Sequence, residues 1–201
     1  MKKIMLPAVA ALAIALGACN KVPQIEGTWQ HPMESFGTTG QNITADGLVS
    51  SQISPQITFI PDKNDNLKGT KTVNTEFNFV DRMVATPEIV MPYALSVSGT
   101  SSINGNYTVY DDDDIAVSFD KNSLKVNIDP KSVSYAENIL DGQQAPELDS
   151  IAPDLVSTFA QMLRTQLLGY YNKFNRIEDI KVKGNILELE LKDSEYVFQK
   201  L

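Results

Sequence analysis

The sequence predicts an all-β protein, an antiparallel up-and-down β-barrel of about eight strands with one helix packed against it. The first observation is a series of short segments in which apolar and polar residues alternate, which is the period of a strand with one buried face. The second is the turn-forming residues that separate these segments. The third is a single stretch, at about residues 149–172, in which apolar residues recur every three or four positions.

The chain begins with a segment typical of a secretory signal. Lys2 and Lys3 precede an apolar run from Ile4 to Leu16, which is shorter than the roughly 20 residues of a membrane-spanning helix. The run ends in Leu16-Gly17-Ala18-Cys19, which resembles the lipobox of bacterial lipoproteins. The resemblance implies cleavage after residue 18 and lipids on Cys19. Several acyl chains would make this anchor close to permanent, since one chain holds a protein only weakly.

The domain is expected to span residues 26–201, after a short polar tether at 19–25. Its first strand is predicted at Gly27-Thr28-Trp29. Residues 31–52 are rich in Ser, Thr, Gly and Asn and hold few large apolar side chains, so they predict a long loop. A loop of this length in a compact domain usually has a function or is mobile.

The remaining strands follow from alternation. The clearest spans residues 72–79, where Val, Thr and Phe alternate with polar residues. Two prolines predict that residues 81–93 form a loop. Asn104-Gly105 predicts a hairpin turn, because a type I′ turn needs positive φ at both central residues. Further strands are predicted around residues 57–59, 95–97, 107–109, 115–119, 124–128, 180–182, 187–191 and 196–201.

The helix predicted at about 149–172 carries a wide apolar stripe and is expected to lie against the barrel or to close one end of it. A helix on the membrane surface is the alternative, but its polar face carries few basic residues. Asp149-Ser150-Ile151 fits a helix cap. The same three residues resemble the O-glycosylation motif of envelope proteins from Bacteroidota, and both interpretations stay open.

Composition excludes several kinds of function. The formal net charge is −8, and removal of residues 1–18 would leave 15 basic and 25 acidic residues, near −10. Such a chain is a poor candidate for binding nucleic acid or anionic lipid head groups through charge. Cys19 is the only cysteine, so an internal disulfide and a thiolate zinc site are both impossible.

Gly27-Thr28-Trp29 also resembles the Gly-x-Trp signature on the first strand of lipocalins and related calycins. The resemblance covers residues 26–201 and implies an up-and-down barrel whose tryptophan plugs one end. A barrel of about eight strands has either a filled core or room for one small ligand. The residues expected to point inward, as core or as ligand contacts, are Trp29, Phe77, Phe79, Tyr107, Phe119 and Leu189.

Three polar features of the sequence are candidate sites. Asp111–Asp114 could supply oxygen ligands to Ca²⁺, but neighbouring strand residues point to opposite faces, which favours a solvated turn. Asp62, Asn64 and Asn66 have the spacing of an EF-hand loop, whose glycine and glutamate positions hold neither residue. His31 is the only histidine and has no Gly-x-Ser-x-Gly motif to accompany it, so it does not predict a catalytic triad.

The sequence therefore predicts a non-catalytic, monomeric lipoprotein of the bacterial cell envelope with no metal and no cofactor. The leading hypothesis is that it binds a small, mostly apolar ligand in the barrel mouth, gated by the 31–52 loop. The alternative is an interaction module with a filled barrel that binds a protein or a glycan by its loops. Asn20 follows the cysteine where an aspartate would be expected for inner-membrane retention, so the outer membrane is predicted.

Overall fold

The computed structural model describes residues 24–36, 41–44, 47–86, 89–135, 148–192 and 194–201, with side chains described throughout except in 41–50, 81–94 and 148–155. The predicted signal at 1–18 and Cys19 lie outside the described residues. The strands are β1 (Gly27–Gln30), β2 (Glu34–Ser35), β3 (Gln41–Thr44), β4 (Gly47–Ser50), β5 (Gln52–Pro61), β6 (Lys68–Thr86), β7 (Ile89–Val109), β8 (Ile115–Phe119), β9 (Lys125–Ile128), β10 (Ser134–Tyr135), β11 (Arg176–Lys183), β12 (Ile186–Leu191) and β13 (Ser194–Lys200). The helices are α1 (Leu148–Tyr171) and the short 3₁₀ turns η1 (Lys121–Ser123), η2 (Pro130–Ser132) and η3 (Asn172–Asn175).

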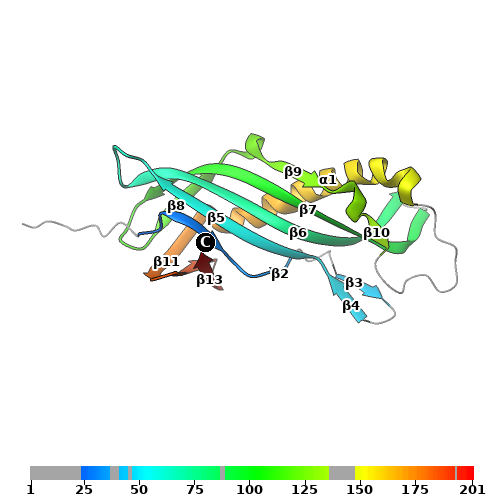
Figure 1. Cartoon of the computed structure of the whole chain (residues 1–201), viewed down its shortest axis with the longest axis horizontal. Coiled ribbons are helices and arrows are strands. Elements are labelled where there is room, and N and C mark those ends of the chain that lie inside the picture. The colour runs from blue at the N-terminus through cyan, green and yellow to red at the C-terminus, as the bar shows by residue number, and fades with distance from the viewer. Residues whose placement is uncertain (1–23, 37–40, 45–46, 87–88, 136–147, 193) are drawn as a thin grey trace, which may run out of the picture.

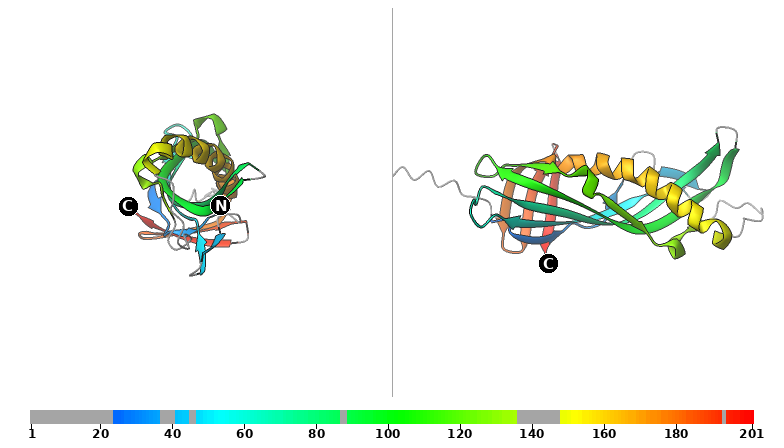
Figure 2. Two further views of the ribbon diagram at one scale, coloured as in Figure 1. Left: turned by 90° about the vertical axis from the view of Figure 1, so that its right-hand side faces the viewer. Right: turned by 90° about the horizontal axis from the view of Figure 1, so that it is seen from above.

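Eight antiparallel strands close a barrel, as Figures 1 and 2 show. Around the ring they run β1, β5, β6, β7, β8, β11, β12 and β13, and β1 pairs with both β5 and β13. Neighbours in the ring follow one another along the chain, with only small elements and α1 between them. This arrangement confirms the predicted fold class, a barrel with a single long helix.

The strands differ greatly in length, so the long strands extend beyond the short ones and leave a sheet surface on which the helix packs. β6 has 19 residues and β7 has 21, whereas β8 has 5. In Figure 1 the long strands run most of the length of the molecule, while β8, β11 and β13 gather at one end. Beyond that end α1 lies within the curve of the long sheet, as the end-on view in Figure 2 shows. The helix therefore covers apolar sheet surface that no further strand covers.

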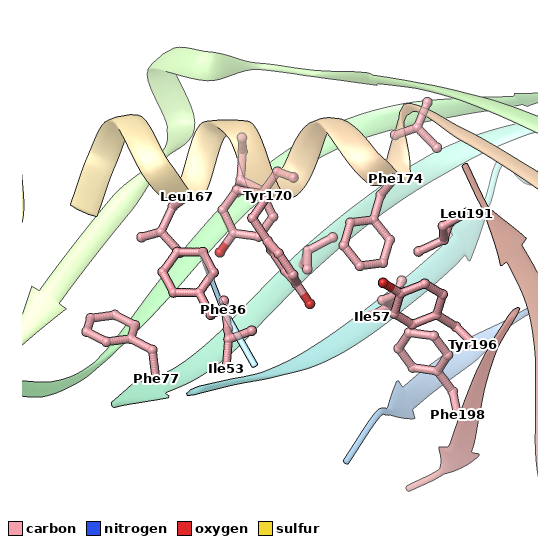
Figure 3. Packing of buried hydrophobic residues seen from close by; sticks show 14 of the residues in the cluster. Phe36, Ile53, Ile57, Phe77, Leu167, Tyr170, Phe174, Leu191, Tyr196 and Phe198 are labelled. Carbon is pink, nitrogen blue, oxygen red and sulfur yellow. The ribbon is translucent and has the colours of Figure 1, made fainter. Parts of the chain in front are cut away.

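The core is one continuous cluster that runs from the closed ring to the helix. Phe159, Leu163 and Leu167 on α1 are fully buried, at the three- and four-residue spacing expected of one helix face. The Phe159 ring meets Phe79 of β6 edge to face, with ring centroids 6.0 Å apart. Figure 3 shows side chains from the strands and from the helix packed against one another in this cluster. The predicted packing of the helix against the barrel is thus confirmed.

The prediction of a loop at residues 81–93 is wrong. β6 continues to Thr86 and β7 begins at Ile89, so this region extends the hairpin between them. Arg82 pairs with Ala94 and Val84 with Val90, which leaves three residues of β7 opposite one of β6. Pro92 falls in this irregular stretch, where the ladder does not need its missing N–H.

The prediction of a hairpin turn at Asn104-Gly105 is also wrong, because both residues lie inside β7. Gly105 pairs with Lys71 on β6 and with Phe119 on β8. A Cβ atom at Gly105 would lie 2.7 Å from the carbonyl oxygen of Ser118. The glycine is required here for the close approach of the neighbouring strand, not for positive φ.

The long loop predicted at residues 31–52 contains strands. β2 pairs with the start of β5, and β3 pairs with β4 in a separate two-stranded sheet. Backbone pairing is available to any residue except proline, so a polar composition did not prevent it. The described start of the segment packs on the barrel, and Phe36 is buried.

Candidate functional site

The aromatic residues expected inside the barrel are placed there. Trp29, Phe77, Phe79 and Tyr107 are buried, and Phe119 is partly buried against the same core. The Trp29 indole N–H donates to the carbonyl oxygen of Ile25 at 2.8 Å, so the polar atom of the side chain is satisfied. Leu189, also expected inside, is buried. These residues fill the interior with hydrocarbon and aromatic carbon.

One charged residue, Lys71 on β6, breaks this apolar interior. Its side chain is completely buried, and its Nζ has no hydrogen-bond partner among the described residues. Three phenyl rings surround the amine instead. Nζ lies 5.2 Å from the ring centroid of Phe59, 5.6 Å from that of Phe119 and 4.9 Å from that of Phe174. We call Lys71 and these three rings the lysine cage.

Burial lowers the pKa of the Lys71 amine well below its ordinary value of 10.5, because a charged group loses its hydration there. The three rings oppose this effect in part, since the face of each ring attracts a cation. The rings are weaker partners than a carboxylate, and none of the described residues supplies a carboxylate to the amine. A buried lysine without a partner is rare in folded proteins.

A cleft that shares Phe119 with the lysine cage lies at a seam of the barrel that has only two strand pairs. β8 and β11 pair only through Ala116 with Arg176 and Ile115 with Ile177. Beyond these two pairs, the end of α1 and η3 take the place of β11 beside β8 and form one wall of the cleft. The cleft there has a volume of about 230 Å³. It is lined by Ile103, Val117, Ser118, Phe119, Lys121, Leu168, Tyr171, Asn172 and Asn175.

Phe119 connects the cleft to the cage. It is a lining residue of the cleft, and its ring is also one of the three around the amine. It is partly exposed and ends β8, immediately before the turn that η1 forms. Of the lining residues only Lys121 carries a formal charge, and it is positive. The cleft therefore has a mixed lining of apolar and polar side chains, and its one formal charge is positive although the chain is acidic.

Tyr171 fixes the helix wall of the cleft. Its hydroxyl lies 2.6 Å from Ser101 Oγ and 3.1 Å from Thr75 Oγ1, and these two hydroxyls also bond to each other. Burial raises the pKa of Tyr171, so the hydroxyl stays neutral. This network holds the last turn of α1 against β6 and β7, close to the lysine cage.

The segment 31–36, proposed as part of a gate, is attached to the barrel. The Tyr170 hydroxyl donates to Glu34 Oε1 at 2.6 Å, and burial, followed by this bond, raises the pKa of Tyr170. His31 Nδ1 lies 2.8 Å from the carbonyl oxygen of Val197, and its ring lies against Tyr196. No serine is described in contact with the imidazole, so the described structure assembles no Ser-His pair.

The acidic runs form turns. The Asp112 N–H donates to Asp111 Oδ1 at 2.8 Å, and the Tyr110 N–H donates to the carbonyl oxygen of Asp114 at 3.2 Å. Asp62 likewise accepts from the Asn64 N–H at 2.8 Å. Among the described residues, no group of three or more His, Cys, Asp or Glu side chains could hold a metal ion.

Sequence reasoning missed Lys71, although a signal was present. Lys71 is an even number of residues away from Val73, Phe77 and Phe79 on the same strand, so alternation places its side chain on the same, buried face. Its cage is assembled from positions 59, 119 and 174, which are far apart in the chain. No local pattern indicates that these rings converge.

Comparisons with family models, with curated proteins and with solved structures found no match to this chain. Within the described ranges, no helix is both long and apolar enough to cross a membrane.

Proposed function

We propose that the protein is a non-catalytic binding protein of the bacterial cell envelope that takes a small, mostly apolar ligand into its barrel. The ligand enters through the cleft between β8 and the end of α1. The observation that carries this proposal is the buried Lys71 amine, which has no partner among the described residues and whose cage shares Phe119 with the cleft. Leaving such a group unpaired costs stability, which a ligand that pairs with it would recover.

The cleft by itself is small for this function. Its 230 Å³ lies below the range of about 300–1,000 Å³ that is usual for pockets of drug-sized ligands. Movement of the Phe119 ring away from Lys71 would join the cleft to the cage and enlarge the site. Phe119 is the last residue of a short strand and is only partly buried, which favours such a movement.

The proposal includes the location of the protein. Lipids on Cys19 would anchor a monomer to the outer membrane, with the barrel held near the lipid surface. A location beside lipid suits a carrier of apolar molecules, because these molecules partition into the bilayer and are scarce in water.

Native mass spectrometry of the protein purified from the envelope of its own host tests the proposal. A bound mass that disappears on denaturation is expected. Leu168→Trp, which places a large ring in the cleft, should abolish this adduct. Val197→Trp, at an exposed position of β13, is the matched control and should retain it. A bare wild-type mass that stays bare after exposure to lipid and metabolite extracts would contradict the proposal.

A second function, binding of an envelope glycan, is favoured by one further observation. A trough of about 300 Å³ crosses the outer face of the sheet, and only one of its side chains, Glu76, is charged. Amides and hydroxyls of this kind hydrogen-bond to sugar hydroxyls. The hydroxyls of Thr75 and Ser101 are already bonded to Tyr171, so the other lining side chains would hold the sugar. The trough is lined by Gln30, Ser54, Gln56, Asn74, Thr75, Glu76, Thr100, Ser101, Ser102 and Asn127. Retention of the wild-type protein on its host's cell-wall glycan, with loss in Asn74→Leu, would favour this function over the first.

A further inference from the structure

The occupant of the lysine cage can be defined from the groups around the amine. Phe59, Phe119 and Phe174 offer ring faces but no hydrogen-bond acceptor, so the amine is unpaired among the described residues. A group that enters beside Nζ and accepts a hydrogen bond or a proton would satisfy it. An anionic oxygen does this best, because charge-assisted hydrogen bonds are about twice as strong as neutral ones.

The charge of the cleft points to the same class of ligand. Lys121 is the only charged residue among its lining residues, although acidic side chains outnumber basic ones in the chain. An anion approaching this cleft meets a positive charge first and no lining carboxylate. A cation would meet repulsion from Lys121 and would find no carboxylate among the lining residues.

We propose that Lys71 receives the acidic head group of an apolar ligand, and that the amine takes up one proton when the ligand binds. The inference rests on the proposed function, since it concerns the same cleft and cage. Above about pH 5 the free ligand is already a carboxylate, so in the step itself Nζ takes its proton from the solvent, and no other covalent bond forms or breaks. The products are a carboxylate and an ammonium in direct contact, with the hydrocarbon tail of the ligand along the cleft.

The lysine cage can hold both the neutral amine and the charged ammonium of Lys71. Without a ligand, burial favours the neutral form, which tolerates an apolar surrounding. With the acid bound, the ammonium gains a carboxylate partner and the faces of the rings, and cation–π attraction is strongest in a desolvated site such as this one. Phe119, which belongs to both the cage and the cleft, is the ring that must move to admit the head group.

Proton uptake makes binding depend on pH. Where the free amine is neutral and the free ligand is a carboxylate, each binding event takes one proton from the solvent, so affinity falls about tenfold per pH unit as pH rises. Of the described residues on the elements around the cage, Tyr107 on β7 and Tyr171 on α1 carry titratable hydroxyls, and Lys173 on η3 and Lys121 in the cleft carry charges. Burial raises the pKa of both tyrosines, so neither of them titrates between about pH 5 and about pH 9.

Decanoic acid and decan-1-ol, which share a chain length and differ in the head group, test the inference by calorimetry. Wild-type protein should bind the acid at least about tenfold more tightly than the alcohol. Titrations in buffers of different ionisation enthalpy should show uptake of about one proton per acid bound. Lys71→Met should bind both compounds with similar affinity and without proton uptake. Lys121→Met, which removes the charge at the mouth, should weaken binding of the acid but retain the uptake.

The outcomes separate the inference from the function on which it rests. Equal affinity of the wild type for acid and alcohol, without proton uptake, overturns the inference and leaves the proposed function standing. A preference for the acid that persists in Lys71→Met overturns the assignment to Lys71. Failure of the wild type to bind either compound at concentrations up to their solubility overturns both.

Discussion

Replacing Lys71 by methionine is expected to make the ligand-free protein more stable. The substitution keeps a long unbranched side chain inside the ring of Phe59, Phe119 and Phe174 but removes the buried amine. Burying a polar group without a partner costs about 1–3 kcal/mol in proteins. Above about pH 10.5, where the amine is largely neutral in both states, Lys71→Met should therefore raise the free energy of unfolding by about that amount, whereas most substitutions of a buried residue lower it.

The size of the gain depends on pH, and linkage determines its direction. Burial lowers the folded-state pKa of Lys71 below the value of 10.5 that applies to an exposed lysine. Between these two pKa values the unfolded chain binds more protons than the folded one, so the wild type becomes more stable as pH rises. The slope reaches about 1.4 kcal/mol per pH unit. The methionine variant lacks this slope, so its advantage is largest at the acidic end of the window and shrinks as pH approaches 10.5.

Urea unfolding at several pH values measures both effects. Trp29 is the only tryptophan and is fully buried, so its fluorescence reports unfolding of the barrel. Lys125→Met, at an exposed position of β9, is the matched control and should change stability by less than about 0.5 kcal/mol. If Lys71→Met is less stable than the wild type, or if its advantage is the same at every pH, the description of Lys71 as an unpaired, largely neutral amine is wrong.

Three further predictions concern the barrel and its anchor. Trp29→Ala should cost about 3–5 kcal/mol in urea unfolding, as truncation of a buried aromatic residue does, and a shift near zero would show that Trp29 is not a structural plug. Tyr171→Phe should cost about 1–2 kcal/mol in calorimetric unfolding, because its hydroxyl bonds to Thr75 and Ser101, and an unchanged melting temperature would contradict that network. Cys19→Ser should move the protein to the soluble fraction or leave it uncleaved, whereas a processed variant that stays with the membrane fraction would refute the lipid anchor.

Several elements were predictable because their signals are local. Alternation between buried and exposed positions located β8, β9, β12 and the centre of β6, and the three-to-four-residue spacing located α1 to within one residue at each end. Each of these patterns depends only on which side of its own element a residue occupies. A segment of five or more residues is long enough to show which of its residues lie on the buried side.

The errors arose where a partner strand decided the conformation. Asn104-Gly105 has the composition of a turn, but β6 and β8 on either side keep it extended. Pro92 suggested a loop, but an irregular register leaves room for it inside β7. Turn propensities of single dipeptides are weaker than the backbone hydrogen bonds of a two-sided ladder.

By itself, the sequence determined that this protein is an all-β barrel with one packed helix, and it placed Trp29, Phe77 and Phe79 in the interior. Only the tertiary structure decided where a site lies. Lys71 is an ordinary lysine in a strand until closure of the ring brings Phe59, Phe119 and Phe174 around its amine. The physical reason is that desolvation depends on every neighbour at once. These neighbours come from three elements spread over more than a hundred residues of chain, so no local pattern indicates that they converge.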